Sequence, residues 1–238
     1  MISVNNRSLA EVRIAHHLWL TAVVVATTLV SPAVANADTV PLGGGAPIVI
    51  DGQTACTLTA IGNDSQGNLV GFTSAHCGGP GAQVASETAV GAGALGVMVA
   101  GNDALDYAVI KFDPAKVTPV NNYNGFQING IGRDPTVGQI ACKQGRSTGN
   151  SCGVVWGAGE QPGTFLSQMC GGPGDSGAPV TVDNLLVGMI HGAFSESLPS
   201  CVIKYIPLHT PAVSESINAV LADLNTKGRP GAGFTPIA

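Results

Sequence analysis

Short apolar or alternating stretches, separated by turn residues, occupy most of the chain beyond its N-terminal segment. Successive side chains of a strand point to opposite faces, so short stretches bounded by glycine, proline, asparagine or aspartate indicate β-strands. The stretches that fit are Thr57–Ile61, Asn68–Thr73, Val97–Val99, Tyr107–Phe112, Gln139–Cys142, Gly153–Trp156, Val180–Val182, Leu185–Ile190 and Val202–Ile206. Many short strands with regular turns predict an all-β domain, either a sandwich or a barrel.

A helical period appears only near the C-terminus. Thr210 is suited to cap a helix and Pro211 to occupy its first position. Apolar residues then recur at three- and four-residue spacing, at Val213, Ile217, Val220, Leu221 and Leu224. We therefore predict a helix over residues 210–226 that packs on the β core. Residues 227–238 contain glycine, proline and threonine and are expected to form a flexible tail.

The N-terminal segment has the features of an export signal. Arg7 and Arg13 precede an apolar run over Leu18–Val30, and Ala35 and Ala37 supply the small residues of a signal-peptidase site. The alternative is a membrane anchor, but the run is shorter than the roughly 18 apolar residues that cross a bilayer. We predict a signal peptide over residues 1–37, cleavage after Ala37, and a secreted protein that is not inserted in a membrane.

The charge pattern argues against a nucleic-acid partner. Lysine and arginine number 10 against 15 acidic residues, giving a formal net charge of −5, and the basic residues form no cluster. Charged residues make up 11% of the chain, and glycine is abundant with 33 residues. This composition is typical of a compact, turn-rich extracellular β protein rather than of a disordered one.

The cysteines predict disulfides. Six follow the signal segment, at Cys56, Cys77, Cys142, Cys152, Cys170 and Cys201. An even number in an exported chain implies oxidised pairs, for which fifteen connectivities exist. We predict the one that closes the shortest loops, 56–77, 142–152 and 170–201. A zinc site is the alternative, but the sequence has no Cys-x-x-Cys pair. We expect neither a metal nor an organic cofactor.

Three motifs contain residues suited to acyl-transfer chemistry, in the order Thr73–Cys77, Asp106–Ile110 and Gly174–Pro179. A serine hydroxyl becomes an effective nucleophile when an imidazole takes its proton and a carboxylate orients that imidazole. His76, Asp106 and Ser176 are the candidates for these three roles. Glycines on both sides of Ser176 allow backbone N–H groups to converge on an oxyanion.

Taken together, these motifs resemble those of the chymotrypsin-like serine peptidases, in particular the secreted actinobacterial enzymes of the streptogrisin and α-lytic protease type. The loop over Cys142–Gly153 and the spacing from Cys170 to Ser176 are similar to that branch. The resemblance extends over about residues 54–224. It implies two six-stranded Greek-key β-barrels, over residues 38–125 and 126–209, followed by the C-terminal helix, with the active site between the barrels.

The resemblance also implies a role for each site residue. Ser176 would attack the scissile carbonyl, His76 would act as general base and then acid, and Asp106 would orient His76. The backbone N–H groups of Gly174 and Ser176 would form the oxyanion hole. Asp103 is a rival for the aspartate, although the family pattern places that residue directly before an alternating strand, as Asp106 is.

Several positions depart from the family pattern. Gln168 stands where trypsin-like members have an aspartate at the floor of the substrate pocket, so cleavage after lysine or arginine is not expected. His191, Gly192 and Ala193 resemble the pocket wall. In one register His191 replaces a serine; in another it matches a histidine of glutamate-specific relatives, which suggests a preference for an acidic P1 side chain. Lys143 or Arg146 is expected to compensate Asp175.

The sequence therefore predicts a secreted, monomeric serine endopeptidase that acts on peptide or protein substrates. The alternative is a catalytically inactive binding or regulatory module with the same fold.

Overall fold

The computed structural model describes residues 39–237, so the predicted signal peptide over residues 1–37 lies outside the described part. The elements of the N-terminal half are β1 Val40–Leu42, β2 Pro47–Ile50, β3 Thr54–Thr57, β4 Ile61–Asn63, β5 Leu69–Thr73, η1 Ala75–Cys77, β6 Gln83–Ser86, η2 Val90–Ala92, β7 Ala94–Asn102, η3 Asp103–Leu105, β8 Tyr107–Phe112 and β9 Val117–Pro119. Those that follow are β10 Asn122–Tyr123, β11 Phe126–Gln127, β12 Gly130–Ile131, β13 Ile140–Gly145, β14 Gly149–Ala158, β15 Thr164–Ser167, β16 Pro179–Val182, β17 Leu185–Ala193, β18 Ala212–Ser216, α1 Ile217–Lys227 and β19 Thr235–Pro236.

The N-terminal half, together with β19 from the C-terminal end, forms one curled antiparallel sheet with the order β19-β4-β5-β8-β7-β6-β2-β3. Strands β3 and β4 lie near its two ends but are consecutive in the chain. The short segment between them continues the pairing, because Leu58 N–H donates to Ala46 O (2.9 Å) and Thr59 N–H donates to Phe72 O (2.8 Å). Buried side chains such as Ile48, Val84 and Ile110 fill the interior of this half.

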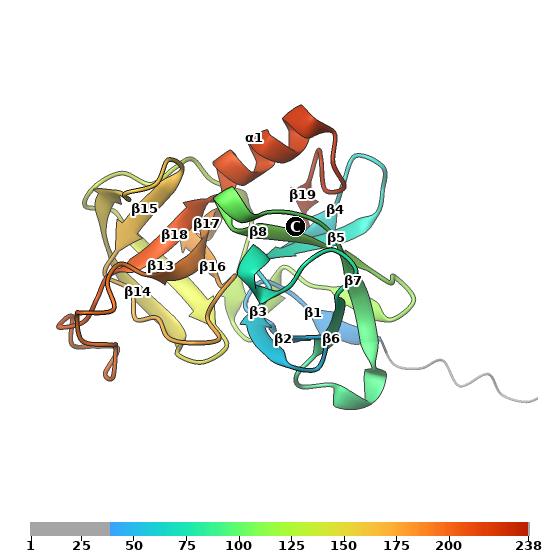
Figure 1. Cartoon of the computed structure of the whole chain (residues 1–238), viewed down its shortest axis with the longest axis horizontal. Helices are drawn as coiled ribbons and strands as arrows, with labels where there is room; N and C mark the ends of the chain where they lie inside the picture. Colours follow the sequence, from blue (N-terminus) through green and yellow to red (C-terminus); the bar gives the residue numbers. More distant parts are fainter. Residues whose placement is uncertain (1–38, 238) are drawn as a thin grey trace, which may run out of the picture. The chain divides into compact units, whose positions relative to one another are not determined.

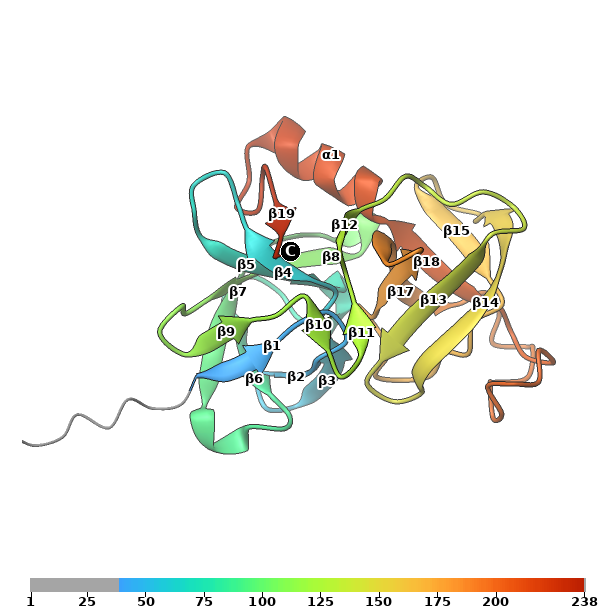
Figure 2. The ribbon, with the colours of Figure 1, turned by 180° about the vertical axis from the view of Figure 1, so that it is seen from behind.

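The C-terminal half forms a closed barrel. Its strands follow the order β17-β16-β13-β14-β15-β18, and β17 also pairs with β18, which closes the ring. Strand β12 adds to β17 in parallel. The β10–β11 hairpin lies in the connection between the two halves (Figure 2), and the predicted domain boundary at residues 125–126 falls at its turn.

The predicted fold class is confirmed: the chain is all-β, with two barrel-like sheets and a C-terminal helix (Figure 1). A third apolar cluster lies between the sheets and the helix. It combines Phe72 and Val109 from the first half, Met189 from the second, and Val220 and Leu224 from α1. None of the helices within residues 39–237 is long and apolar enough to cross a membrane.

The predicted start of the helix is wrong. Residues 212–216 form strand β18, and α1 begins at Ile217. Its cap is Ser216, whose hydroxyl accepts a hydrogen bond from Ala219 N–H (3.2 Å). Pairing with both β15 and β17 closes the barrel and outweighs the weak helix-start signal of Thr210 and Pro211.

Two further expectations are also wrong. Residues 202–206 do not form a strand; they lie in an exposed loop in which Val202 is 91% exposed. The C-terminal tail is not loose, because β19 pairs with β4 and the Phe234 ring packs edge-on against Phe72, with centroids 4.7 Å apart. Its aromatic residue gives the tail apolar area to bury, which offsets the entropy lost on ordering it.

A polar contact ties α1 to the first barrel. Tyr107 Oη donates to Asp223 Oδ2 (2.6 Å), and Asn102 and Lys227 also bond this carboxylate. Together these bonds lower the pKa of Asp223 to about 2. The bond from Lys227 contributes most to this shift, followed by the bond from Tyr107. Ionised Asp223 therefore stabilises the fold above the unfolded-state pKa of 3.8, and this contribution is lost as pH falls toward 2.

We expect Asp223→Asn to remove about 1–2 kcal/mol of stability at pH 7 and to flatten the loss of stability between pH 5 and pH 2. Urea unfolding at a series of pH values measures both effects. Glu160→Gln, at an exposed position, is the matched control. An unchanged acid slope in Asp223→Asn would contradict this assignment.

Candidate active site

Strand pairing brings the histidine and aspartate motifs to one edge of the first barrel. Strands β5 and β8 are antiparallel, with Thr73 opposite Ala108, so the end of β5 lies beside the start of β8. His76 follows β5 on the short helix η1, and Asp106 ends η3 just before β8. Asp106 adopts a left-handed conformation (φ +41°), which aspartate tolerates better than most residues. Ala75 N–H donates to Asp106 O (3.1 Å), which joins the two segments.

Hydrogen bonds across the two barrels position the serine loop. Ser176 lies between β15 and β16, and its carbonyl accepts a bond from Thr57 N–H on β3 (2.9 Å). Thr59 Oγ1 donates to Gly177 O (2.6 Å). Gly177 has a positive φ (+80°), and a Cβ there would collide with Thr57 and Thr73. Only glycine fits this close approach, so the glycine after Ser176 serves barrel docking as well as the turn.

The three candidate catalytic side chains form a continuous hydrogen-bonded chain. His76 Nδ1 lies 2.9 Å from Asp106 Oδ2 and 3.0 Å from Oδ1, and His76 Nε2 lies 2.7 Å from Ser176 Oγ. Because Nδ1 faces a carboxylate, it carries the proton, which leaves Nε2 free to accept the serine proton. Asp106 also accepts from His76 N–H (3.0 Å). Its side chain is 6% exposed, whereas that of His76 is 47% exposed.

Of the two aspartates considered, Asp106 lies against His76. Asp103 begins η3, where Asn102 Oδ1 caps the turn by accepting from Ala104 N–H. The arrangement pairs a serine with a base and the base with a buried carboxylate, which is the geometry that activates a serine for attack on a carbonyl.

Backbone donors lie beside the serine. Gly174 has φ +94°, a conformation that non-glycine residues rarely adopt. Within residues 39–237, the N–H groups of Gly174 and Ser176 donate to no protein acceptor, whereas those of Asp175, Gly177 and Ala178 do. Two N–H groups of the Gly174–Ser176 segment that the fold leaves unpaired fit the predicted oxyanion hole, since such groups bind developing negative charge.

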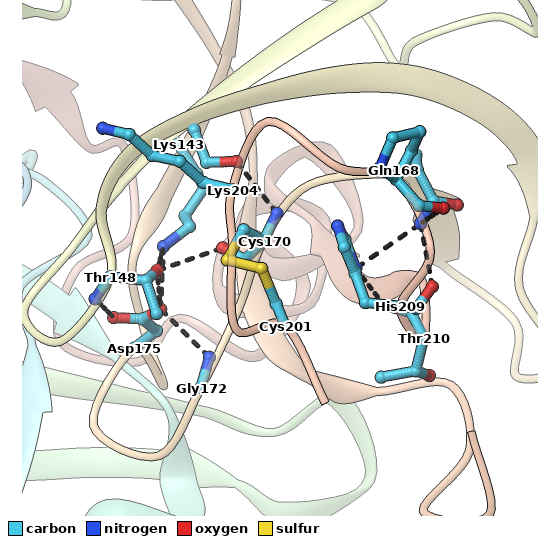
Figure 3. Close-up of a disulfide and its surroundings, with 12 residues drawn as sticks. Lys143, Thr148, Gln168, Cys170, Gly172, Asp175, Cys201, Lys204, His209 and Thr210 are labelled. Atoms are coloured by element: carbon cyan, nitrogen blue, oxygen red, sulfur yellow. Dashed lines mark hydrogen bonds and ion pairs between the residues drawn. A yellow bond between two sulfur atoms is a disulfide. The ribbon is translucent and has the colours of Figure 1, made fainter. Parts of the chain in front are cut away.

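The carboxylate of Asp175, next to Ser176, has a buried cation as its partner (Figure 3). Lys143 Nζ lies 2.7 Å from Asp175 Oδ2, and both side chains are fully buried. Asp175 also accepts from Thr148 Oγ1 (2.5 Å) and from the N–H groups of Ser147 (2.8 Å) and Gly172 (3.1 Å). Burial lowers the pKa of Lys143, and the charge of Asp175 partly offsets that effect.

Lys143 is therefore the group that compensates Asp175, one of the two alternatives that the sequence left open. Arg146, the other, pairs with Glu87 on the surface through its Nε (2.5 Å to Oε2). Asp175 Oδ1 accepts from the turn between β13 and β14, and its Oδ2 accepts from Gly172, so this carboxylate joins the turn to the loop that contains Gly174 and Ser176.

His191 lies behind the triad rather than apart from it. Its Nδ1 is 2.9 Å from Glu215 Oε1 and 3.5 Å from Asp106 Oδ2, and its ring centroid is 6.2 Å from that of His76. Hydrogen bonding to Glu215 raises the pKa of His191; burial opposes the shift, and the charge of Asp106 adds to it.

The remaining predicted pocket residues are Gln168, Gly192 and Ala193, and the first lies near the Cys170–Cys201 disulfide. Gln168 Nε2 donates to His209 O (2.9 Å), which ties the position to the segment before β18 (Figure 3). Gly192 and Ala193 end β17, opposite Val213 and Ala212. A Cβ at Gly192 would contact nothing within 4 Å, so the backbone there borders open space.

The disulfides join the predicted pairs, Cys56–Cys77, Cys142–Cys152 and Cys170–Cys201. The first fixes η1, and with it His76, to β3. Among residues 39–237, no group of three or more histidine, cysteine, aspartate or glutamate side chains is arranged to hold a metal ion.

Sequence reasoning missed two residues of this region. Glu215 falls inside the predicted helix, so the sequence gives no indication that it is the partner of His191. The alternation Ala212 to Ser216, small and polar residues around one valine, is the signal that could have indicated a strand. Thr148 lies in the Cys142–Gly153 loop, where the sequence gives no sign of its role, yet it bonds both members of the Lys143–Asp175 pair.

The fold is that of the chymotrypsin-like serine proteases. Solved structures with the same fold include a Nocardiopsis protease, NAPase (21% identity, 78% of this chain and 97% of that chain covered, TM-score 0.62) and a Cellulomonas bogoriensis chymotrypsin (24%, 83% and 98%, 0.60). A glutamic-acid-specific serine protease is also similar (19%, 82% and 100%, 0.64). No family model matches the sequence, and no curated protein matches it.

Proposed function

We propose that this protein is a serine endopeptidase that hydrolyses peptide bonds through a Ser176–His76–Asp106 triad and an acyl-enzyme intermediate. The observation that carries the proposal is the continuous chain of contacts from Ser176 Oγ through His76 to Asp106, at 2.7 and 2.9 Å. In this mechanism His76 takes the proton of Ser176 as the hydroxyl attacks the scissile carbonyl. It then gives that proton to the leaving amine, and water repeats the sequence to release the acid.

The buried carboxylate and the backbone donors supply the electrostatic part of the mechanism. Asp106 stabilises the imidazolium that forms on His76, because its side chain is 6% exposed and little water screens the charge. The N–H groups of Gly174 and Ser176 would bind the oxyanion of the tetrahedral intermediate. An inactive binding module is not favoured, since it has no need of a serine and an imidazole held 2.7 Å apart.

The substrate pocket favours side chains other than lysine and arginine. The position of its floor has a neutral amide, Gln168, so no carboxylate compensates a cationic P1 side chain there. The similar glutamic-acid-specific protease uses a histidine triad in substrate binding. Among the histidines of residues 39–237, His76 and His191 lie at Asp106, and His209 lies next to the position of the pocket floor, with Nδ1 3.4 Å from Gln168 Nε2.

We therefore expect peptides with P1 glutamate to be cleaved at least about 10-fold faster, as kcat/KM, than those with P1 lysine, since a charge-assisted hydrogen bond is worth about 1.5–3 kcal/mol. A peptide set that differs only at P1, with Glu, Leu, Phe and Lys, measures this. Gln168→Asp is the matched variant, and it should raise kcat/KM for the peptide with P1 lysine. Equal turnover of Glu, Leu and Phe would contradict the acidic preference while leaving the endopeptidase proposal intact.

Secretion is part of the proposal. The sequence of residues 1–37 and three disulfides support export to an oxidising compartment. When the full chain is expressed in a secreting host, we expect the mass of the exported protein to correspond to a start at Asp38. Retention of the whole chain in the cell fraction would argue against export.

A further inference from the structure

His191 occupies a β-bulge directly behind the catalytic aspartate. The pairing of β17 with β18 shifts register between Ile190 and Gly192, which leaves His191 as the extra residue. Bulges redirect a side chain relative to the regular alternation of a strand, and they are frequent beside active sites. Here the bulge directs the imidazole toward Glu215 Oε1 (2.9 Å) and Asp106 Oδ2 (3.5 Å).

The surroundings of His191 contain more negative than positive charge. The side chains of Glu215 and Asp106 are 1% and 6% exposed. Within residues 39–237, Glu215 Oε2 is buried without a hydrogen-bond partner, and the only side chains that form ion pairs with these two carboxylates are His76 and His191. Burying an ionised carboxylate costs free energy unless a cation or hydrogen bonds compensate its charge. A proton on His191 therefore stabilises the charges of both Glu215 and Asp106.

Three titratable groups face His191 from the elements around it. Glu215 comes from β18, Asp106 from the end of η3, and His76 from η1. Strand β16, which pairs with the other edge of β17, has the sequence Pro-Val-Thr-Val and contributes none. The bond to Glu215 raises the pKa of His191, the same direction that the geometry requires.

We propose that His191 and Glu215 form a proton-controlled positioning pair for Asp106, so that the reactivity of Ser176 depends on the protonation of two histidines. This inference rests on the proposed peptidase function. The positive charge of protonated His191 offsets part of the negative potential that Asp106 exerts at His76. The imidazolium that forms on His76 is then less stabilised. When His191 loses its proton, Asp106 and Glu215 both act on His76, and the serine becomes more reactive.

The test measures the rate at which a fluorophosphonate labels Ser176 from pH 5 to pH 9, because this reagent does not depend on P1 preference. The wild-type rate should rise in two steps, one for each histidine. The His191 step should be about 3- to 30-fold, the size expected for one unit charge 6.2 Å away in a partly screened site. His191→Gln should retain a single step. Glu215→Gln should move the His191 step to lower pH by at least about half a unit, because it removes the negative charge that stabilises the proton on His191.

Ser214→Ala is the matched control and should keep the wild-type profile. It truncates the buried neighbour of Glu215 on β18, and the Ser214 hydroxyl has no hydrogen-bond partner among residues 39–237. NMR of the imidazole nitrogens follows the His191 titration directly in wild type and Glu215→Gln. Two steps in His191→Gln, or an unchanged His191 titration in Glu215→Gln, would overturn the inference alone. Absence of labelling at every pH would instead contradict the proposed function, and with it this role of His191.

Discussion

Replacing Ser176 by alanine is expected to lower kcat on the best P1 peptide by about 10⁶-fold, the loss seen when a triad nucleophile is removed. The hydroxyl that His76 activates is then absent, and only substrate binding and the backbone donors still act. Asp106→Asn should cost less, about 10⁴-fold, because the amide holds the imidazole but favours the wrong tautomer. Initial rates across an enzyme concentration series measure both.

Ser197→Ala, which truncates an exposed serine, serves as the control for this series and should match wild type. The double variant Ser176→Ala/His76→Ala should be no slower than Ser176→Ala, because residues that act as one unit lose their function together. Residual turnover in Ser176→Ala within 100-fold of wild type would mean that another group is the nucleophile.

Replacing Lys143 by methionine is expected to destabilise the fold by about 3–5 kcal/mol, because it leaves the charge of Asp175 buried without a cation. Lys143 and Asp175 are both fully buried, so water cannot take the place of the lost partner. The serine loop should lose order at the same time, since Asp175 bonds Gly172 within it. Urea unfolding measures the stability, and the fluorophosphonate labelling rate measures the order of the loop.

Arg146→Met is the matched control, because it breaks an ion pair with Glu87 in which both side chains are about one-third exposed. Screening by water limits that pair to about 0–1 kcal/mol. The double variant Lys143→Met/Asp175→Asn should recover part of the stability lost in Lys143→Met, because the uncompensated charge is then gone. Equal losses in Lys143→Met and Arg146→Met would contradict the assignment of Lys143 as the structural cation.

The features that could be predicted from sequence are those encoded locally. Each candidate motif has its turn residues beside the histidine, aspartate or serine that it places, and the strand that follows Asp106 is visible as Tyr107–Phe112. The disulfide pairs also follow a local rule, since each closes a short loop. The choice between Lys143 and Arg146 could not be made, because it depends on which side chain the β13–β14 hairpin buries.

The features that were missed depend on distant contacts. Strand β18 has weak intrinsic signals, and it exists because two other strands, β15 and β17, pair with it. The residues of the predicted strand 202–206 are apolar enough for a sheet, yet they pair with no strand in the described part of the chain. The position of His191 depends on a bulge, and a one-residue shift in register turns a side chain to the opposite face of a sheet.

The most direct test of the account is fluorophosphonate labelling of the purified, disulfide-intact protein expressed from the full chain, with the modified residue located by mass spectrometry. We expect stoichiometric labelling at Ser176 that is lost in Ser176→Ala, in His76→Ala and after unfolding in urea. Folded wild-type protein that remains unlabelled, or is labelled equally when His76 is replaced, would contradict the claim that His76 and Asp106 activate Ser176.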